Sequence, residues 1–313
     1  MTTMRAVMIH EFGDSSVLKL ESAPVPELSD GQVLVRVHAT SINPIDEKTR
    51  AGSGLSGMYK DLLPVILGWD VSGVVEAVGA EVTEFKTGDE VYGMPLFPGV
   101  AKTYADYMVA PASELAKKPE NLSYGEAAAL PLVALTAHQA FETIDLKAGE
   151  TILVHAAAGG VGHVAVQLAK ARGANVIGTA SSRNHSFLKS LGVAEVIDYT
   201  QTPFESVVKN VDAVFDCVGG EVLSRSYSVV REGGRLVTIA GQPSEELAKQ
   251  HGIEAYRVLV KPDKAGLEFI AGLVEAGQVK PFVQEEFKLE DIAKAHDLVA
   301  SGHVRGKVVM RLL

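Results

Sequence analysis

The sequence predicts an α/β protein with two domains, one built on a doubly wound parallel sheet and the other on a β-barrel. The chain has 313 residues, which is long for a single hydrophobic core. Its first 125 residues contain short strand patterns separated by turns, whereas the later residues alternate between strand and helix patterns. Apolar residues make up 47% and charged residues 22%, as is usual for a globular protein.

The first domain, residues 1–125, is expected to be rich in β-structure. Along residues 32–39, Val33, Val35 and Val37 lie on one face and Gln32, Arg36 and His38 on the other, which is the period of a half-buried strand. Further candidate strands, bounded by glycine, proline and aspartate turns, lie at 5–9, 18–22, 72–79 and 90–94. This succession of short strands favours a barrel-like domain.

The second domain, residues 126–265, is expected to hold the parallel sheet. A helical pattern follows Asn121 or Ser123, either of which could cap it. Helical patterns then separate predicted strands at 151–155, 175–179, 195–198, 213–216, 235–240 and 256–260. Such alternation is typical of a parallel sheet covered by helices on both faces. The tail, residues 266–313, has two helical patterns and a last strand, and is expected to return to the first domain.

Charge and cysteine content exclude several classes of protein. A net charge of -10 argues against nucleic-acid binding through overall charge. The first residues lack the apolar core of a signal peptide, and no apolar segment is long enough to span a bilayer. The single cysteine, Cys217, cannot form an intramolecular disulfide or a multi-cysteine zinc site. We expect a soluble cytoplasmic protein without a membrane or nucleic-acid partner.

A glycine-containing turn with the sequence HAAAGGVG, residues 155–162, joins a predicted strand to a predicted helix. Turns of this kind bring the backbone close to a diphosphate, which the N–H groups of the following helix then bind. An alanine stands where the fingerprint usually has its first glycine, and a plain strand–helix turn is the alternative. The expected ligand contacts are Ala156, Gly159, Gly160, Val161 and Gly162.

The distribution of charge after this turn favours NADP(H). Enzymes that select NAD place an acidic residue about 20 residues after the turn. From Thr151 to Ala194 the chain contains no acidic residue, and Ser181 and Arg183 occupy the corresponding region. Hydroxyl and guanidinium groups suit a 2′-phosphate. The alternative is that Arg183 is only a solvated loop residue.

Residues 149–170 resemble the signature of the quinone oxidoreductase (zeta-crystallin) branch of the medium-chain dehydrogenase/reductase superfamily. The resemblance continues through segments 41–52, 67–79, 129–141, 215–220 and 306–309, and so covers nearly the whole chain. It implies a GroES-like (chaperonin-10-like) barrel that carries the substrate, a Rossmann domain that carries NADPH, and an active site in the cleft between them. It also implies a homodimer.

The same resemblance implies that the catalytic zinc of related alcohol dehydrogenases is missing. Asn43, Trp69 and Asp70 stand where those enzymes have a cysteine, a histidine and an acid. Neither an amide nor an indole replaces a thiolate or an imidazole on Zn²⁺. Without a Lewis acid, acceptors that take a hydride readily remain feasible, namely quinones and carbonyl-activated alkenes.

Hydrogen-bond donors for the developing oxyanion are expected at Asn43 or Tyr59, although a tyrosine in such a loop often only packs. Asp46 is expected to line the cleft or contact the nicotinamide ribose, with a helix-capping role as the alternative. Matching family positions suggest further cofactor contacts at Thr136, Tyr199, Val218, Ile239, Gly241 and Lys307. For Lys307 a plain surface role is the alternative.

These observations predict an NADPH-dependent quinone reductase that transfers hydride directly, without zinc. The alternative enzyme reduces the C=C bond of alkenals or enones, since the same cleft and cofactor would serve. An alternative of another class is an NADPH-binding, crystallin-like structural or RNA-binding protein. The net charge of -10 disfavours RNA binding as its main task. No residue pattern in the sequence distinguishes quinone from enone.

Overall fold

Two sets of segments form separate cores in the computed structural model, which describes residues 2–313. Unit 1 consists of residues 2–132, 261–275 and 281–313, and unit 2 of residues 133–260 and 276–280. These bounds differ from the expected boundaries after 125 and 265 by a few residues. Residues 276–280, expected in the first domain, belong to unit 2.

Unit 2 is built on a six-stranded sheet in which every pair of neighbouring strands is parallel. The strand order is β11 (Glu195–Asp198), β10 (Asn175–Ala180), β9 (Thr151–Val154), β12 (Val211–Asp216), β13 (Val230–Thr238) and β14 (Glu254–Arg257). The order reverses between β9 and β12, where the crossover changes direction. The predicted doubly wound parallel sheet is therefore confirmed.

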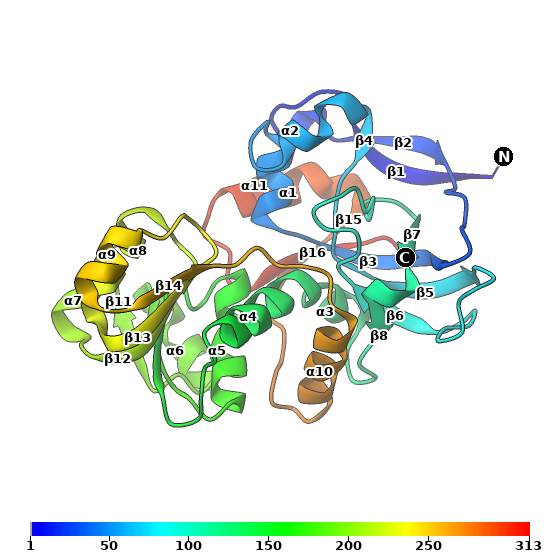
Figure 1. Cartoon of the computed structure of the whole chain (residues 1–313). Coiled ribbons are helices and arrows are strands. Elements are labelled where there is room, and N and C mark those ends of the chain that lie inside the picture. Colours follow the sequence, from blue (N-terminus) through cyan, green and yellow to red (C-terminus); the bar gives the residue numbers. More distant parts are fainter. Residues whose placement is uncertain (1) are drawn as a thin grey trace. The chain divides into compact units, whose positions relative to one another are not determined.

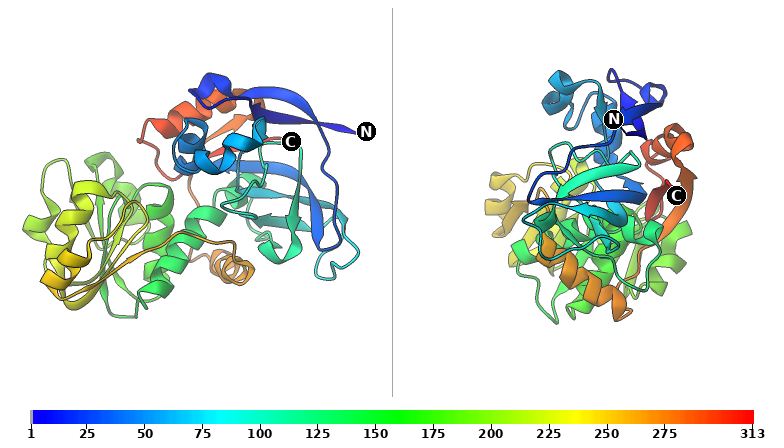
Figure 2. Two further views of the ribbon diagram at one scale, coloured as in Figure 1. Left: turned by 45° about the horizontal axis from the view of Figure 1, so that its top comes forward. Right: turned by 90° about the vertical axis from the view of Figure 1, so that its right-hand side faces the viewer.

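Helices cover both faces of this sheet, as Figures 1 and 2 show. They are α4 (Pro131–Thr143), α5 (Gly160–Ala171), α6 (His185–Ser190), α7 (Phe204–Val207), α8 (Gly220–Ser226) and α9 (Glu245–His251). Side chains from the middle strands, including Leu153, Val214 and Leu236, pack with Phe204 and Tyr227 in one buried cluster. This burial of apolar surface is the main stabilising term for the unit.

Unit 1 contains a seven-stranded sheet and a three-stranded sheet. The larger has the order β15 (Val283–Lys288), β16 (Lys307–Arg311), β3 (Gln32–Ile42), β5 (Val71–Val78), β6 (Glu90–Gly93) and β8 (Leu115–Lys117), with β7 (Tyr107–Pro111) also paired to β3. The smaller has the order β2 (Lys19–Pro24), β1 (Thr3–Ile9) and β4 (Val65–Ile66). Because β16 pairs antiparallel with β3, the C-terminal strand belongs to the sheet of the first residues.

The strand predicted at 32–39 is present as part of β3. Its alternate residues Val33, Val35 and Val37 are fully buried and the residues between them are half-buried, as the period of two requires. The strand continues to Ile42, beyond the alternating part, and its last four residues are all buried. The side chains that follow Ile42 are consequently held inside unit 1.

Unit 1 also contains helices, including one at Asp46 that the sequence indicated only as an alternative. Helix α1 (Pro44–Arg50) follows Asn43, has proline at its first position, and is followed by α2 (Ser56–Tyr59). Proline is favoured at the first helical position because its missing N–H has no partner there. Unit 1 further contains α3 (Tyr124–Ala128), α10 (Lys264–Glu275) and α11 (Ile292–Ala300).

The helical pattern after residue 121 forms two helices instead of one. Ser123, and not Asn121, caps α3, since its hydroxyl accepts a hydrogen bond from the N–H of Glu126. Pro131 then begins α4 as its first residue. Among residues 2–313 there is no helix with the length and apolarity needed to cross a bilayer.

Candidate active site

The glycine turn of unit 2 lies between the end of β9 and the start of α5. Gly159 is the N-cap of α5, and a Cβ on Gly162 would lie only 2.2 Å from the carbonyl oxygen of Ala156. A side chain at Gly162 would therefore push the helix away from the turn. The first N–H groups of a helix have no intrahelical partner and attract anions. The geometry is that of a diphosphate-binding turn.

Ala156 has a φ of +50°, in the left-handed region. The fingerprint uses glycine at this position because glycine adopts such a backbone at little cost, whereas a residue with a Cβ does not. Thr179, near the end of β10, accepts two hydrogen bonds from this segment. Its carbonyl oxygen accepts from the N–H of Ala157 at 3.0 Å, and its Oγ1 accepts from the N–H of Ala156 at 3.3 Å.

His155, which sequence reasoning did not single out, lies beside this segment. Its ring is 1% exposed, with Nδ1 3.1 Å from Oγ1 of Thr179 and Nε2 3.0 Å from Oγ of Ser226. Burial lowers the pKa of His155 to about 4, so the imidazole is neutral at pH 7. The available signal was its position directly after β9, at the carboxyl edge of the sheet.

The residues that follow β10 form the region expected to meet a 2′-phosphate. Ser181 is half-buried, while Ser182 and Arg183 are exposed in a short 3₁₀ turn, Ser182–Asn184. The next strand toward the sheet edge, β11, ends just before Tyr199, whose side chain is 61% exposed. Unit 2 thus places hydroxyl, guanidinium and phenol groups after neighbouring strands.

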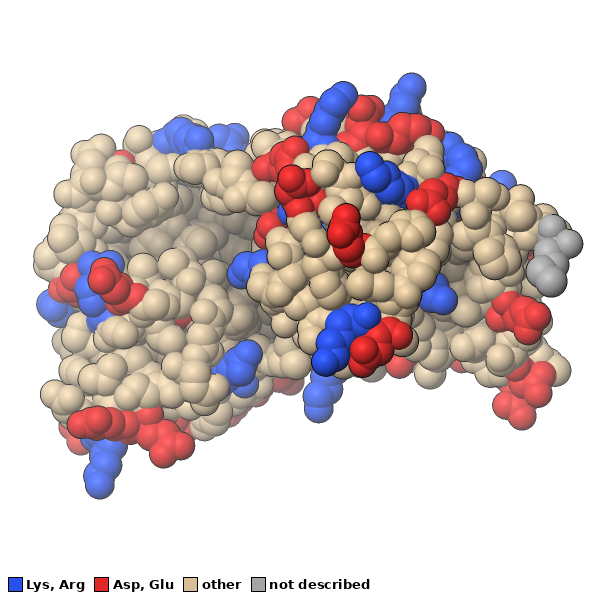
Figure 3. All heavy atoms as spheres, turned by 90° about the horizontal axis from the view of Figure 1, so that it is seen from above, with Lys and Arg blue, Asp and Glu red and all other residues tan. Residues whose placement is uncertain are grey.

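The carboxyl edge of the sheet exposes apolar side chains where ligands of open α/β sheets bind. Besides Tyr199, Val218 after β12 and Leu259 after β14 are about half exposed, and Ile239 and Gly241 after β13 are partly buried. Leu259 was not predicted from the sequence. The face drawn in Figure 3 carries its charged side chains in separate groups, with uncharged surface between them.

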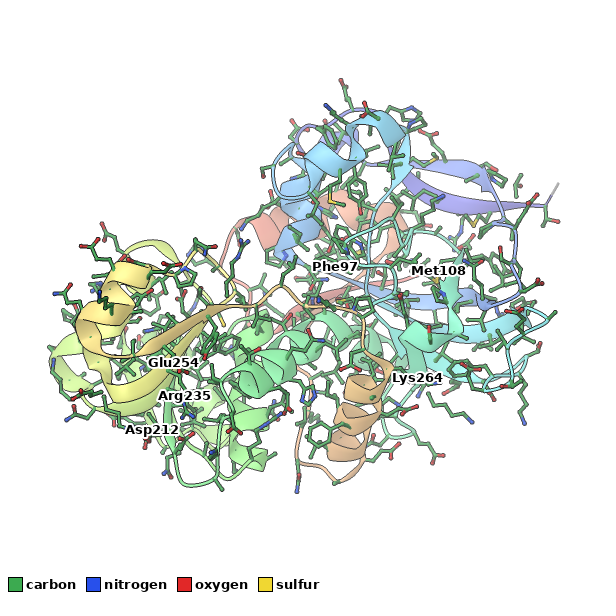
Figure 4. All side chains as sticks on the ribbon, viewed as in Figure 1. Phe97, Met108, Asp212, Arg235, Glu254 and Lys264 are labelled. Carbon is green, nitrogen blue, oxygen red and sulfur yellow. The ribbon has the colours of Figure 1, made fainter. Side chains whose placement is uncertain are left out.

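A buried carboxylate fixes the loop of Val218. Asp216 accepts hydrogen bonds from the N–H groups of Val218 and Gly219 and from the hydroxyl of Thr238 at 2.7 Å. By contrast, Arg235 on β13 is in register with Glu254 on β14, and Asp212 on β12 directly precedes Ala213, the β12 partner of Arg235 (Figure 4). Asp212 pairs with Arg231 at 2.6 Å and Arg235 pairs with Glu150 at 2.5 Å, whereas the exposed residues after the strands are mostly apolar.

Thr136 lies in α4, as the resemblance implied, and is 4% exposed. Its expected contact with the nicotinamide stays a prediction. The single cysteine, Cys217, follows Asp216 and is half-buried, and burial raises the pKa of its thiol. A thiol of this kind is a poor nucleophile.

In unit 1, Asp70 is the centre of a buried polar cluster. Its Oδ1 accepts from the N–H of Leu132 at 2.8 Å. Its Oδ2 accepts from the hydroxyl of Ser41 at 2.6 Å and from the amide Nδ2 of Asn43 at 2.8 Å. Asp70 and Asn43 are both 0% exposed, so their polar atoms are satisfied inside the unit.

Lys307 belongs to the same cluster, and the alternative of a surface role is wrong. Its side chain is 3% exposed, and its ammonium group donates to the carbonyl of Ile42 at 3.1 Å and to Oδ1 of Asn43. The same Nζ lies 3.6 Å from Oδ2 of Asp70. Burial lowers the pKa of Lys307, and the Asp70 carboxylate opposes that shift. Its ammonium group thus lies in the interior of unit 1, where it bonds to Asn43 and lies close to the carboxylate of Asp70.

Asp46 occupies the first turn of α1 and is fully buried. Its Oδ2 accepts from the backbone N–H of Asn43 at 2.8 Å, which confirms the helix-capping alternative. Burial, with a smaller contribution from the Asp70 carboxylate, raises the pKa of Asp46 to about 7, although the hydrogen bond from Asn43 opposes this shift. A substantial fraction of Asp46 is therefore protonated at neutral pH.

Tyr59 is 1% exposed, and its hydroxyl lies 2.9 and 2.8 Å from the carbonyl oxygens of Pro98 and Gly99. The indole N–H of Trp69 donates to the same Gly99 carbonyl at 2.7 Å. Trp69 also packs edge-to-face against Phe97, labelled in Figure 4. Because the single hydroxyl proton of Tyr59 is directed at these carbonyls, the geometry favours the packing role.

Trp69, at a zinc-ligand position, offers no lone pair to a metal, and the carboxylate of Asp70 is used by Asn43, Ser41 and Leu132. Within residues 2–313, three or more His, Cys, Asp or Glu side chains do not gather where they could hold a metal ion. This donor set does not fit Zn²⁺.

Comparisons with known proteins identify the family of the chain. Residues 29–120 match the alcohol dehydrogenase GroES-like domain, and residues 191–310 match the zinc-binding dehydrogenase family. The human quinone oxidoreductase is 32% identical over 99% of this chain and 98% of its own length. The NADPH-dependent alkenal/one oxidoreductase of Arabidopsis thaliana is 35% identical over 98% of this chain and 79% of its own length.

Among solved structures, the quinone oxidoreductase from Coxiella burnetii is similar with a TM-score of 0.94 and 40% identity, and all of both chains is covered. The agreement extends over both units of the fold. Similarity of this extent indicates common descent, while the chemistry of this chain depends on its own side chains.

Proposed function

The chain belongs to the medium-chain dehydrogenase/reductase superfamily, in its quinone oxidoreductase branch, and from this premise we propose that it is an NADPH-dependent quinone reductase. The observation that carries the proposal is the side-chain set at the zinc positions, where Asn43 and Trp69 cannot polarise an alcohol for oxidation. The acceptor must then be activated by its own carbonyl groups, as quinones are.

The residues of unit 2 fit NADPH. The turn of Ala156, Gly159, Gly160, Val161 and Gly162 would hold the diphosphate, because Gly162 lets the start of α5 approach the turn closely. Ser181 and Arg183 would hold the 2′-phosphate, since acidic residues are lacking from Thr151 to Ala194. The remaining proposed contacts are Thr136, Tyr199, Val218, Ile239 and Gly241. When bound, NADPH supplies the hydride.

Asn43 and Asp46 are proposed to act from inside unit 1. Both are fully buried, so we assign them to holding the start of α1 and not to direct contact with the acceptor. Lys307 supports them, since its ammonium group bonds to the Asn43 side chain. Reduction of a quinone by one hydride gives a hydroquinone anion, which takes its proton from water. This step needs neither a metal nor a strong protein acid.

The experiment that tests the proposal follows NADPH oxidation by the purified protein with an ortho-quinone and with a short enone, and repeats both with NADH. Fast quinone turnover with strong preference for NADPH supports it. Turnover of the enone alone would replace it with the second candidate, a double-bond reductase, which the Arabidopsis relative favours. Tight NADPH binding without turnover of either acceptor would instead indicate a binding protein.

We further propose that the protein acts as a homodimer in the cytoplasm, without a nucleic-acid partner. The superfamily membership supports the dimer, and the net charge of -10 opposes RNA binding. Light scattering at several concentrations tests the dimer. Salt-dependent retention on RNA would contradict the last point.

A further inference from the structure

The hydroxyl of Ser226 determines which nitrogen of His155 carries a proton. In α8, Oγ of Ser226 donates its only hydrogen to the carbonyl oxygen of Val222 at 2.7 Å. The same Oγ lies 3.0 Å from Nε2 of His155. Since its hydrogen is already used, Ser226 must accept, and the Nε2 atom of His155 must donate. Nε2 therefore carries a hydrogen.

The neutral imidazole then leaves Nδ1 as an acceptor. Oγ1 of Thr179 lies 3.1 Å from Nδ1 and must donate its hydroxyl hydrogen to it. The lone pairs of that Oγ1 remain available to the N–H of Ala156, 3.3 Å away. Burial favours the neutral ring, because His155, Thr179 and Ser226 are at most 3% exposed. Every hydrogen bond in the series from Val222 to Ala156 thus has one determined direction.

We propose that His155 is a positioning residue for the diphosphate turn: with Ser226 and Thr179 it holds the Ala156 amide and stabilises the left-handed backbone there. This inference rests on the proposed NADPH function. Ala156 has a φ of +50° without being glycine, so the turn depends on bonds from outside. Thr179 is the acceptor in two of these hydrogen bonds. Its hydroxyl oxygen accepts from the N–H of Ala156, and its carbonyl oxygen accepts from the N–H of Ala157.

These hydrogen bonds would affect binding by orienting the backbone of the turn. The amides of Ala156 and Ala157 are directed toward Thr179, on β10, and the carbonyl of Ala156 accepts from the N–H of Gly159 at 2.9 Å. These bonds fix the path of the chain into α5, whose first N–H groups would meet the diphosphate. Loss of these hydrogen bonds would let the turn change its conformation. Ligands that carry a diphosphate would then bind more weakly.

The decisive variants are Thr179→Val and Thr179→Ser, compared by isothermal titration calorimetry with NADPH and with adenosine 2′-phosphate, which lacks the diphosphate. Thr179→Val keeps the shape and the backbone bond to Ala157 but removes the hydroxyl. We expect it to weaken NADPH binding about 5- to 30-fold, the effect of one or two buried hydrogen bonds, and to leave adenosine 2′-phosphate binding unchanged. Thr179→Ser should restore NADPH binding to within about 3-fold of the wild type.

Two serines of α8 provide a matched pair at the far end of the series. Ser226→Ala removes the acceptor of His155 and should weaken NADPH binding in the same selective way. Ser224→Ala is the control, since Ser224 is exposed and its hydroxyl bonds only to the carbonyl of Gly220. Circular dichroism and thermal unfolding verify that each variant is folded.

The tautomer is measured directly by nitrogen NMR of histidine side chains, with His155→Phe to assign the signal. An unprotonated Nδ1 and a protonated Nε2 support the inference, and the opposite tautomer overturns it. Equal NADPH affinity in wild type and Thr179→Val also overturns it, as does equal weakening of both ligands. If the wild type itself does not bind NADPH, the proposed function fails, and the positioning role fails with it.

Discussion

The ammonium nitrogen of Lys307 lies 3.6 Å from Oδ2 of Asp70 in the interior of unit 1, where the two side chains are 3% and 0% exposed. Asn43 bonds to both, through its amide nitrogen to Asp70 and through its amide oxygen to Lys307. Two of the three positions that the resemblance aligns with zinc ligands, Asn43 and Asp70, therefore belong to a buried ionic cluster joined to the C-terminal strand β16. A pair of this kind depends on both partners, because a buried charge without its partner is costly.

Replacing Lys307 should destabilise the protein strongly. Lys307→Met leaves the Asp70 carboxylate without its cation, and we expect a loss of about 3–5 kcal/mol in the free energy of unfolding. Denaturant titration measures this loss. Lys294→Met is the control, since Lys294 is 74% exposed and forms only a surface pair. A loss from Lys307→Met no larger than that of the control would contradict the buried pair.

Removal of the Tyr59 hydroxyl should affect stability more than catalysis. Tyr59→Phe leaves the carbonyls of Pro98 and Gly99 with fewer donors, although Gly99 keeps the indole N–H of Trp69. We expect a loss of about 1–2 kcal/mol in stability and a kcat close to that of the wild type. Steady-state kinetics with the preferred acceptor measure the kcat of the variant and of the wild type, and denaturant titration measures their stability. A large fall in kcat would restore Tyr59 as a catalytic donor.

Arg183 should determine the preference for NADPH. Arg183→Ala removes the proposed partner of the 2′-phosphate, a charge-assisted bond, so kcat/KM for NADPH should fall about 10- to 100-fold. The value for NADH should change little because NADH has no 2′-phosphate. Lys249→Ala, an exposed change on α9, is the control. Equal losses with both cofactors would show that Arg183 does not recognise the phosphate.

Chelation should leave quinone reduction unchanged. The side chains at Asn43 and Trp69 offer Zn²⁺ no thiolate or imidazole. We therefore expect full activity after dialysis against a strong chelator, and elemental analysis without stoichiometric zinc. Loss of activity on chelation, recovered by added zinc, would contradict hydride transfer without a metal.

The stability of the protein should depend on the protonation of Asp46. Its pKa is about 7 in the folded protein, above the value of 3.8 in an unfolded chain. As the pH rises from about 4 to about 7, the unfolded chain loses this proton first, so unfolding becomes easier, by about 1.4 kcal/mol per pKa unit. The charged groups that act on Asp46 are Asp70 and Lys307.

Asp46→Asn isolates this effect, since its amide oxygen can still accept from the Asn43 N–H. The difference in unfolding free energy between wild type and variant should fall between pH 4 and pH 7 and stay constant above it. Denaturant titrations at several pH values measure the difference. A difference independent of pH would mean that Asp46 is ionised like an exposed carboxyl group.

Local patterns sufficed for much of the fold. The alternation of Val33, Val35 and Val37 predicted β3, and the strand–helix succession predicted the parallel sheet that the structure shows. Helix α1 was indicated only through the alternative capping role of Asp46, although Asn, Pro and Asp in this spacing are a capping signal. Lys307 was expected to contact the cofactor or to lie on the surface, because lysine is rarely buried without a partner and its partners are distant in the sequence.

The sequence by itself determined the order of most strands and helices, the glycine turn before α5, the lack of acid near Arg183 and the presence of Asn43 and Trp69 where the resemblance expects zinc ligands. Each of these depends on residue types at short spacing along the chain. Only the tertiary structure decided how the polar groups pair. Lys307 meets Asn43 across 264 residues, and His155 meets Ser226 across 71. Such pairs form because burial leaves a polar group few partners, and burial is a property of the packed units.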